Sequence, residues 1–408
     1  MDKEGENIAD QETHSKEDLL NIRDFENALK ETKIYSGHER DIIDILQEDL
    51  RSTDYSKDST GLEPGDFDPK ELLNHNFEAY KYTRGQLIDW IMIIFEQLEL
   101  NSEIYEDKLR GFLVNICSNY RRVPYHHFTH AFSLTNGAYW ILSNIGKEGP
   151  SDEKQGAYKF FSKDDILGII LGCIGHDVNH PGMNNGYLLK TKDDLLILCS
   201  KFTDDDSVTT ISEEGMSSHV LEELGTDNKN SVLENMHLKI MLHCMDILPK
   251  EKADSVSQAI AEGILCTDMS KHGTLVEKLK AIGEKFKENE TYTPTQEERT
   301  FLAAMIVHAC DLNGLILDYD HSFKWGMRIA QEFHDQYCAE EKLDQEKYGQ
   351  PLAFLKYTGA EAFKKSQAGF CKNIILPMWQ VLYDILKFDR VVIDNIEKNQ
   401  ELLLEGLD

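Results

Sequence analysis

Apolar residues recur at the three- and four-residue spacing of helices along most of the chain. The pattern is densest between about residues 67 and 388, and prolines rarely interrupt it. We therefore predict an all-α fold. The helices are expected at residues 85–100, 109–119, 128–145, 163–180, 191–198, 232–247, 253–268, 275–287, 296–312, 322–338, 361–371 and 374–388, with an acidic, fraying helix end at 397–408.

The segment 163–180 stands out among these helices. Its apolar residues lie nearly all round the helix axis, so we expect the helix to be buried. Ser162 is a favourable N-cap, and Asp165 places an acidic residue in the first turn. The rest of the fold is expected to pack around this segment.

The end of the same helix carries candidate chemistry. His176 and His180 are four residues apart, which places them on one face of the predicted helix, and Pro181 is expected to end it. Two imidazoles and the carboxylate of Asp177 lose their hydration on burial, and a bound cation compensates for that loss most directly. The alternative is that these residues simply cap a core helix.

Four further polar clusters accompany this one. His126 and His130 are four residues apart and are expected to be helical neighbours, while Asp311 ends the apolar stretch 303–310. The other two clusters surround Glu234 and Thr267. Any one of them is compatible with capping or with a polar surface. Together they supply a ligand set for a divalent transition metal, with a carboxylate to share with a second, harder ion: His130, His176, Asp177 and Asp311.

Charge and cysteine usage narrow the class of protein. Lys and Arg number 43 and Asp and Glu 73, which gives a net charge of −30. Such a charge disfavours binding of a DNA or RNA polymer through a basic face. The eight cysteines form no CxxC pair and several lie in apolar runs, as reduced thiols do. We expect a soluble, cytoplasmic protein with no membrane span and no signal peptide.

Composition also suggests a division of the chain. We predict an acidic N-terminal extension at 1–62, one large domain at 63–395 with a polar insertion at about 200–230, and an acidic tail at 396–408. The extension is expected to be regulatory, dimerising, disordered or idle, so a homodimer is compatible with the sequence. The insertion borders the candidate site and is a candidate lid.

Six motifs, in this order, resemble class I cyclic nucleotide phosphodiesterases over about four fifths of the chain. They are His126-x3-His130, His176-Asp177-x2-His180-Pro181-Gly182-x2-Asn185, Leu233-Glu234-Asn235, Thr267-Asp268-Met269-Ser270-Lys271-His272, Asp311, and Ser366-Gln367-x-Gly369-Phe370 with Pro377-x-Trp379.

The resemblance implies a compact, all-helical HD-type metallohydrolase whose catalytic domain is the 63–395 region, with a deep metal-containing pocket. Its implied activity is hydrolysis of cAMP or cGMP to the nucleoside 5′-monophosphate, which ends cyclic nucleotide signalling. A hydroxide shared by two metal ions attacks the phosphate in this scheme, and a histidine acts as general acid.

The roles of individual residues follow from the resemblance as well. Zinc would be held by His130, His176, Asp177 and Asp311, and Asp177 would bridge to Mg²⁺ or Mn²⁺. His126 would be the general acid. Metal-bound waters would be oriented by His180, Glu234 and Thr267. The substrate pocket would contain Gln367 against the base, Phe370 and Ile329 on its two faces, and Tyr125, His237 and Met269.

Three positions depart from the family pattern. His127 stands where the family usually has Asn, Met236 where it has His, and Gly314 where it has an Asn that contacts the base, with Asn313 beside it. The preference between cAMP and cGMP therefore stays open. Two alternative functions also stay open: an HD-type hydrolase of another phosphoester, against which Gln367 and Phe370 argue, and a non-catalytic nucleotide-binding or scaffold protein.

Overall fold

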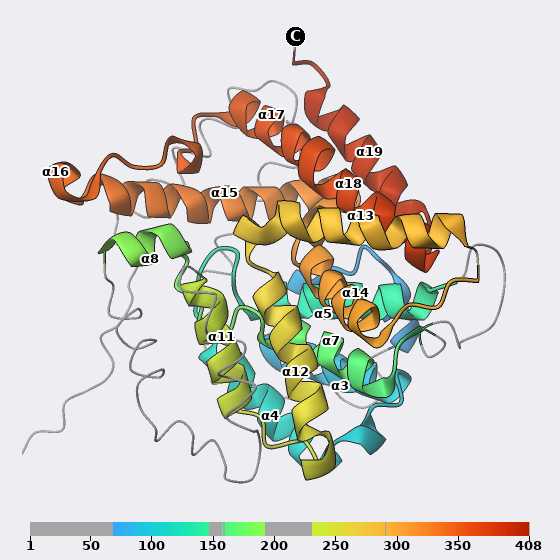
Figure 1. Cartoon of the computed structure of the whole chain (residues 1–408). Coiled ribbons are helices and arrows are strands. Elements are labelled where there is room, and N and C mark those ends of the chain that lie inside the picture. Colours follow the sequence, from blue (N-terminus) through green and yellow to red (C-terminus); the bar gives the residue numbers. More distant parts are fainter. Residues whose placement is uncertain (1–67, 147–156, 158–159, 192–230, 290, 408) are drawn as a thin grey trace, which may run out of the picture.

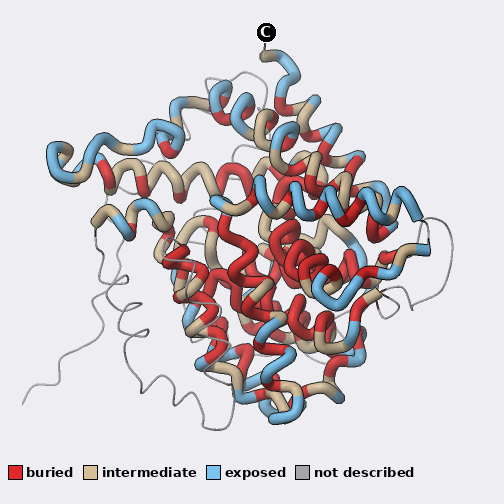
Figure 2. Tube along the Cα trace, viewed as in Figure 1, coloured by how far each residue is buried: buried red, intermediate tan, exposed pale blue. Residues whose placement is uncertain are grey.

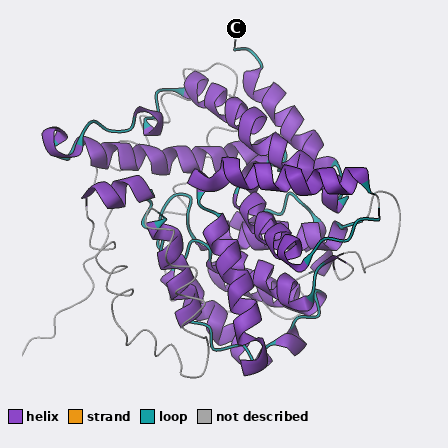
Figure 3. Ribbon diagram, in the orientation of Figure 1, coloured by secondary structure: helices purple, strands orange, loops and turns teal. Residues whose placement is uncertain are grey.

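A computed structural model describes residues 68–146, 157, 160–191, 231–289 and 291–407. The predictions for 1–62, for the insertion at 200–230 and for the helix at 191–198 lie outside these residues. The described part is built of helices and contains no strand (Figures 1 and 3), which confirms the all-α fold. None of its helices is long and apolar enough to cross a membrane.

Most predicted helices form within a few residues of their expected bounds. The π-helix Cys371–Ile375 joins α17 to α18. The α-helices are α3 (Arg84–Gln97), α4 (Glu106–Asn119), α5 (Phe128–Asn144), α7 (Lys163–Gly175), α8 (Asn185–Thr191), α11 (Val232–His243), α12 (Lys250–Cys266), α13 (His272–Glu288), α14 (Gln296–Asp311), α15 (Tyr319–Glu341), α16 (Gln345–Tyr348), α17 (Ala360–Phe370), α18 (Leu376–Leu386) and α19 (Val391–Leu404).

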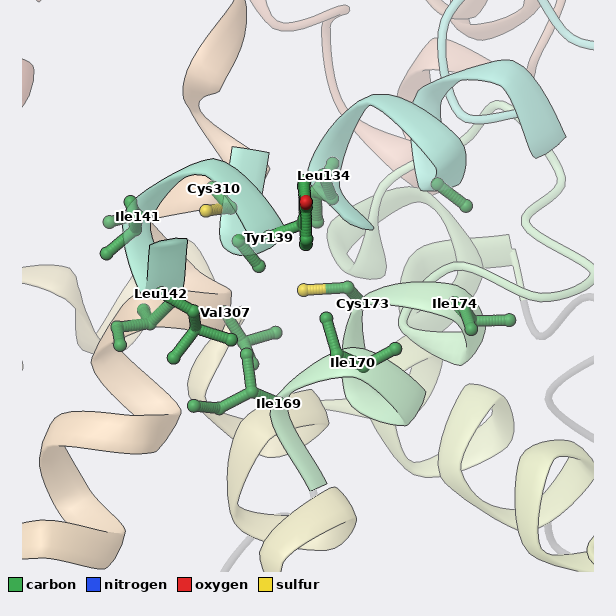
Figure 4. Packing of buried hydrophobic residues seen from close by; sticks show 14 of the residues in the cluster. Leu134, Tyr139, Ile141, Leu142, Ile169, Ile170, Cys173, Ile174, Val307 and Cys310 are labelled. Atoms are coloured by element: carbon green, nitrogen blue, oxygen red, sulfur yellow. The ribbon is translucent and has the colours of Figure 1, made fainter. Parts of the chain in front are cut away.

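Helix α7 is the centre of the molecule, as its composition predicts. Every residue from Asp165 to Gly175 is buried (Figure 2). A capping box between Ser162 and Asp165 fixes where the helix begins. It packs against α5, α12 and α14. Figure 4 shows the apolar contact: Ile169, Ile170 and Cys173 of α7 face side chains of α5 together with Val307 and Cys310 of α14.

Two pairs of histidines that were expected to lie on one helical face do not. Helix α7 ends at Gly175 with His176 as its C-cap, and Asn179 adopts a left-handed conformation with φ of 68°. His176 and His180 therefore do not share a helical face. A turn, which asparagine tolerates better than most residues, separates them. Helix α5 begins at Phe128, as predicted, so His126 precedes the helix that carries His130 and the two are not neighbours on one helical face.

The C-terminal helix belongs to the packed body. Helix α19 continues across the predicted boundary at 395/396, and Asn399 and Leu403 on it are buried. The Asn399 amide donates to the carbonyls of Leu315 and Leu317, at 3.1 and 2.8 Å. The helix thereby holds the segment that connects α14 to α15.

Close packing of α7 against α12 depends on a glycine. A Cβ built at Gly168 would overlap the Ala259 methyl group, and the Ala259 backbone lies only 3.4 Å from it. Gly168→Ala is expected to lower the free energy of unfolding by about 1–3 kcal/mol, because the two helices must move apart. Urea unfolding measures this. Gly111→Ala on α4 is the matched control, since nothing lies within 4 Å of its added Cβ. Equal stability of the two variants would contradict the packing argument.

Candidate functional site

Four buried or half-buried side chains from three helices converge where these helices end or begin. His130 lies in the first turn of α5, His176 and Asp177 follow α7, and Asp311 is the last residue of α14. One ligand atom from each lies within 4.8 Å of the others. The structure thus brings together the four predicted metal ligands, which form a cluster able to hold a metal ion.

The hydrogen bonding of His176 tests whether this cluster suits a cation. Its Nδ1 lies 3.0 Å from the carbonyl of Cys173, which can only accept, so Nδ1 carries the hydrogen. Its Nε2 therefore faces Oδ2 of Asp177 at 2.9 Å and Oδ1 of Asp311 at 3.2 Å. A lone pair that faces two carboxylates needs a positive charge between them. The donor set of two imidazoles and two carboxylates fits a divalent transition metal.

The pKa values in the cluster reflect the close approach of His176 to the two carboxylates. Burial would lower the pKa of His176, but the charges of Asp177 and Asp311 raise it well above its usual range. Burial would raise the pKa of each carboxyl, but the charge of His176 outweighs it and lowers the pKa of both Asp177 and Asp311 below the usual range. Both carboxylates are thus ionised and ready to bind a cation.

The cluster lies at one side of a cavity of about 980 Å³. His130 and His176 lie in the cluster itself. All other predicted site residues line the cavity: Tyr125, His126, Asp177, His180, Glu234, His237, Thr267, Met269, Asp311, Ile329, Gln367 and Phe370. The cavity is large enough for a mononucleotide-sized ligand, and both polar and apolar side chains line it.

His126 is held by a carboxylate that the sequence analysis missed. Glu332 of α15 accepts hydrogen bonds from the backbone N–H groups of Tyr125 and His126, at 2.9 and 3.1 Å, and its second oxygen pairs with Nδ1 of His126. Burial lowers the pKa of His126, but Glu332 and Asp177 outweigh it and raise the pKa to about 9. His126 is therefore a protonated imidazole at neutral pH, with Nε2 left to donate.

Glu332 could have been found only from its spacing along α15. It is one of four polar residues at intervals of four, and all four are buried: Arg328, Glu332, Gln336 and Glu340. In the sequence such a row looks like the solvated face of an acidic helix.

The residues expected to orient water have definite partners. Asn185 donates to both carboxylate oxygens of Glu234, at 3.2 and 3.0 Å, and burial raises the pKa of Glu234 to about 7. The Thr267 hydroxyl donates to the carbonyl of Ile264 at 2.8 Å, which leaves only its lone pairs for the cavity. His237 lies 3.6 Å from Asp177.

His180 stacks on His126. Their ring centroids are 4.0 Å apart at an angle of 26°. Nδ1 of His180 accepts from the N–H of Gly182 at 3.0 Å, and burial together with the charge of His126 holds the pKa of His180 well below its usual range. The neutral ring of His180 thus covers one face of the charged ring of His126.

The three departures from the family pattern are accommodated in the fold. His127 is the N-cap of α5, where its Nδ1 accepts from the N–H of Thr129 at 3.1 Å. Met236 is buried in an apolar cluster with Leu188 and Val232. Burial, helped by Arg328, holds the pKa of His127 well below its usual range, so its Nδ1 remains an acceptor.

The third departure, Gly314, lies in the wall of the cavity. Gly314 lines the cavity, and a Cβ there would lie 2.9 Å from that of Trp325. The amide of the neighbouring Asn313 turns away and donates to the carbonyl of Ser133 at 2.8 Å. Gln367, in contrast, is one of the side-chain amides that line the cavity.

Removing a ligand of the cluster tests the metal site directly. His176→Ala is expected to abolish most zinc binding, because only three of the four donor side chains remain. The metal content of dialysed protein, measured by mass spectrometry, checks this. His243→Ala on the exposed surface of α11 is the control. Equal zinc content in the two variants would exclude the cluster as the binding site.

Comparison with curated proteins finds relatives that share most of this chain. It is 25% identical over 346 residues to the "cGMP-specific 3′,5′-cGMP phosphodiesterase 3" of Dictyostelium discoideum, covering 82% of this chain and 64% of the relative. It is 26% identical over 326 residues to the "cGMP-specific 3′,5′-cyclic phosphodiesterase" of Drosophila melanogaster, covering 77% and 25%. The chain thus spans less than two thirds of the length of these relatives.

Solved structures share its fold. The phosphodiesterase domain of a rhodopsin fusion protein from the choanoflagellate Salpingoeca rosetta matches with a TM-score of 0.65 at 20% identity, over 82% of this chain and 97% of that one. The structure titled LmjPDEB1 in complex with IBMX matches with a TM-score of 0.63 at 19% identity, over 89% and 97%.

A family model covers the region that holds the cavity. The model is described as "3′5′-cyclic nucleotide phosphodiesterase", and it matches residues 125–208 and 220–396. This match includes every residue of the cluster and the cavity-lining residues from Tyr125 to Phe370. The chain belongs to the 3′,5′-cyclic nucleotide phosphodiesterase family.

Proposed function

We propose that this protein hydrolyses a 3′,5′-cyclic nucleotide, cAMP or cGMP, to the nucleoside 5′-monophosphate. One observation carries the proposal: the His and Asp cluster shares a cavity with a carboxylate-bound imidazolium, His126, and with an aromatic and amide pair, Phe370 and Gln367. The first two suit a phosphate diester, and the third suits a purine. The family to which the chain belongs supports the same activity.

The metal ligands are proposed to act as in the resemblance. His130, His176, Asp177 and Asp311 would hold Zn²⁺, and Asp177 would also serve a second ion, Mg²⁺ or Mn²⁺. His180, Glu234 and Thr267 would orient bound water. When bound, these cations neutralise charge on the phosphate oxygens and lower the pKa of water so that it attacks phosphorus near neutral pH. The chain's own part is to keep both carboxylates ionised in a buried place.

His126 is proposed to supply the proton that the leaving oxygen, O3′, needs. Water releases one proton to the solvent and its oxygen adds to phosphorus, while the bond from phosphorus to O3′ breaks and leaves negative charge on O3′. His126, protonated and fixed through Nδ1 by Glu332, donates its Nε2 proton to O3′. General acid catalysis of this kind is typically worth about 10²–10⁴-fold in rate.

The nucleoside is proposed to lie in the part of the cavity that Ile329, Gln367 and Phe370 line. Phe370 and Ile329 would lie on the two faces of the purine, and the amide of Gln367 can both donate to and accept from its edge. The walls of the cavity also include Tyr125, His237 and Met269.

We also propose that the protein is cytoplasmic, as its thiols suggest: all seven described cysteines are free, and five of them are buried.

Turnover of cAMP and cGMP side by side tests the proposal. Zinc- and magnesium-loaded protein is expected to convert at least one of them to the 5′-monophosphate, identified by chromatography, and His126→Asn is expected to lower kcat about 10²–10⁴-fold. His243→Asn is the matched control. Turnover of other phosphate esters alone would support the broader hydrolase, and tight nucleotide binding without turnover would support a non-catalytic protein.

The contact between Glu332 and His126 predicts a shift in the pH profile. His126 acts only while protonated, so its raised pKa keeps activity up to higher pH. Glu332→Gln removes the charge that raises this pKa, and the alkaline limb of kcat/KM is expected to move to lower pH by about 1 pH unit or more. Glu341→Gln, an exposed carboxylate on the same helix, serves as control. An unmoved alkaline limb would exclude this role for Glu332.

A further inference from the structure

The buried polar row on α15 has a second half that the proposed chemistry does not use. Residues four apart lie on one helical face, so Arg328, Glu332, Gln336 and Glu340 form a continuous line, each at most 2% exposed. Glu332 serves His126. Gln336 and Glu340 lie one and two turns further along, away from His126 and the metal cluster.

This second half contacts two different walls of the cavity. Gln336 accepts from the backbone N–H of Asn184 at 2.8 Å and donates to Glu340 at 2.8 Å. The other oxygen of Glu340 lies 3.3 Å from Nζ of Lys190, at the end of α8, and 3.3 Å from the N–H of Leu352. One buried carboxylate thus links α15 to α8 and to the loop after α16.

The loop at 349–359 is attached to α15 near both of its ends. Leu352 donates to Glu340, and Tyr357 donates to Nδ1 of His334 at 3.4 Å. Every residue between these two points lines the cavity, and Phe354 among them is 69% exposed. The loop also packs on α15, since Phe354 contacts Phe333, Lys356 lies over the ring of Tyr337, and Leu355 is buried. The two hydrogen bonds fix the backbone at either end of this packed stretch, and so help to set where this wall of the cavity stands.

We propose that Glu340 and Lys190 are positioning residues: through Gln336 and the Leu352 N–H they hold α8 and the 349–359 loop as the two outer walls of the cavity, and thereby determine nucleotide affinity rather than the rate of the chemical step. This inference rests on the proposed hydrolysis. It assigns a role to a buried ion pair that touches neither the metal ligands nor His126.

The burial of the Glu340–Lys190 pair predicts a strong effect on nucleotide affinity, although the pair contacts no catalytic group. The Glu340 carboxylate is buried, and Lys190 is 22% exposed at its side chain, so solvent screens their interaction only in part. Loss of Glu340 leaves the Lys190 ammonium, the Leu352 N–H and the Gln336 amide without their acceptor at once. The two walls then lose their common attachment, whereas Glu332 keeps all its contacts with the general acid.

Steady-state kinetics of Glu340→Ala tests the inference. KM is expected to rise about tenfold, while kcat changes by less than about threefold, because uniform binding is lost and the catalytic groups are untouched. Glu341→Ala, one residue along and exposed, is the matched control and should leave both constants unchanged. A fall in kcat with KM unchanged, or no change in either, would overturn the proposal.

Lys190→Met tests the same pair by changing its half-buried partner. It should raise KM in the same direction, and the double variant Lys190→Met/Glu340→Ala should be no worse than Glu340→Ala alone, since Lys190 acts through Glu340. Fully additive effects would contradict this. Because Lys190 is half-buried and lies at a helix end, this variant also decides the question if Glu340→Ala does not fold.

Hydrogen exchange separates failure of this inference from failure of the proposed function. The Leu352 amide should exchange faster in Glu340→Ala than in Glu341→Ala, whatever the protein hydrolyses. A wild-type protein that turns over neither cAMP nor cGMP would refute the proposed function. Unchanged exchange at Leu352, together with an unchanged KM in an active enzyme, would refute the positioning role.

Discussion

The structure depends on one electrostatic constraint: two carboxylates and two imidazoles must share a space less than 5 Å across in a buried place. Asp177 and Asp311 would repel each other there, and the imidazoles can offset them only by binding a proton or by sharing a cation. The Cys173 carbonyl fixes the hydrogen of His176 on Nδ1, and this turns the free nitrogen toward both carboxylates. The ends of α5, α7 and α14 are therefore fixed relative to one another by the need to neutralise charge.

The apolar pattern of the sequence predicts the helices well because most of them bury one apolar face in a common core, in which α7 packs against α5, α12 and α14. It locates the start of α7 at Lys163, since the capping box of Ser162 and Asp165 is local and needs no tertiary contact. It does not locate the end of that helix at Gly175, because the apolar pattern contains no sign of the turn that follows, in which Asn179 is left-handed. The prediction of His176 and His180 on one helical face fails for this reason.

The candidate site, too, can be predicted only in part from the sequence. Motifs and the family resemblance point to side chains that the cavity does bring together, but the assignment of roles needs partners that spacing does not reveal. Glu332 lies 206 residues from His126, and its carboxylate resembles any other acidic group on an amphipathic helix. Burial and the two backbone N–H groups that it accepts from distinguish it, and only the fold supplies both.

The order of side chains within the α15 row follows from its burial. Two carboxylates four residues apart on one face would repel each other, and more strongly in a buried place than in water. Gln336 separates Glu332 from Glu340, so the charges lie about 12 Å apart along the helix, and its amide can accept from Asn184 while it donates to Glu340. A leucine would satisfy neither partner, and a glutamate could not donate. The row can therefore serve the general acid at one end and the walls of the cavity at the other, because a neutral residue joins its two charged ones.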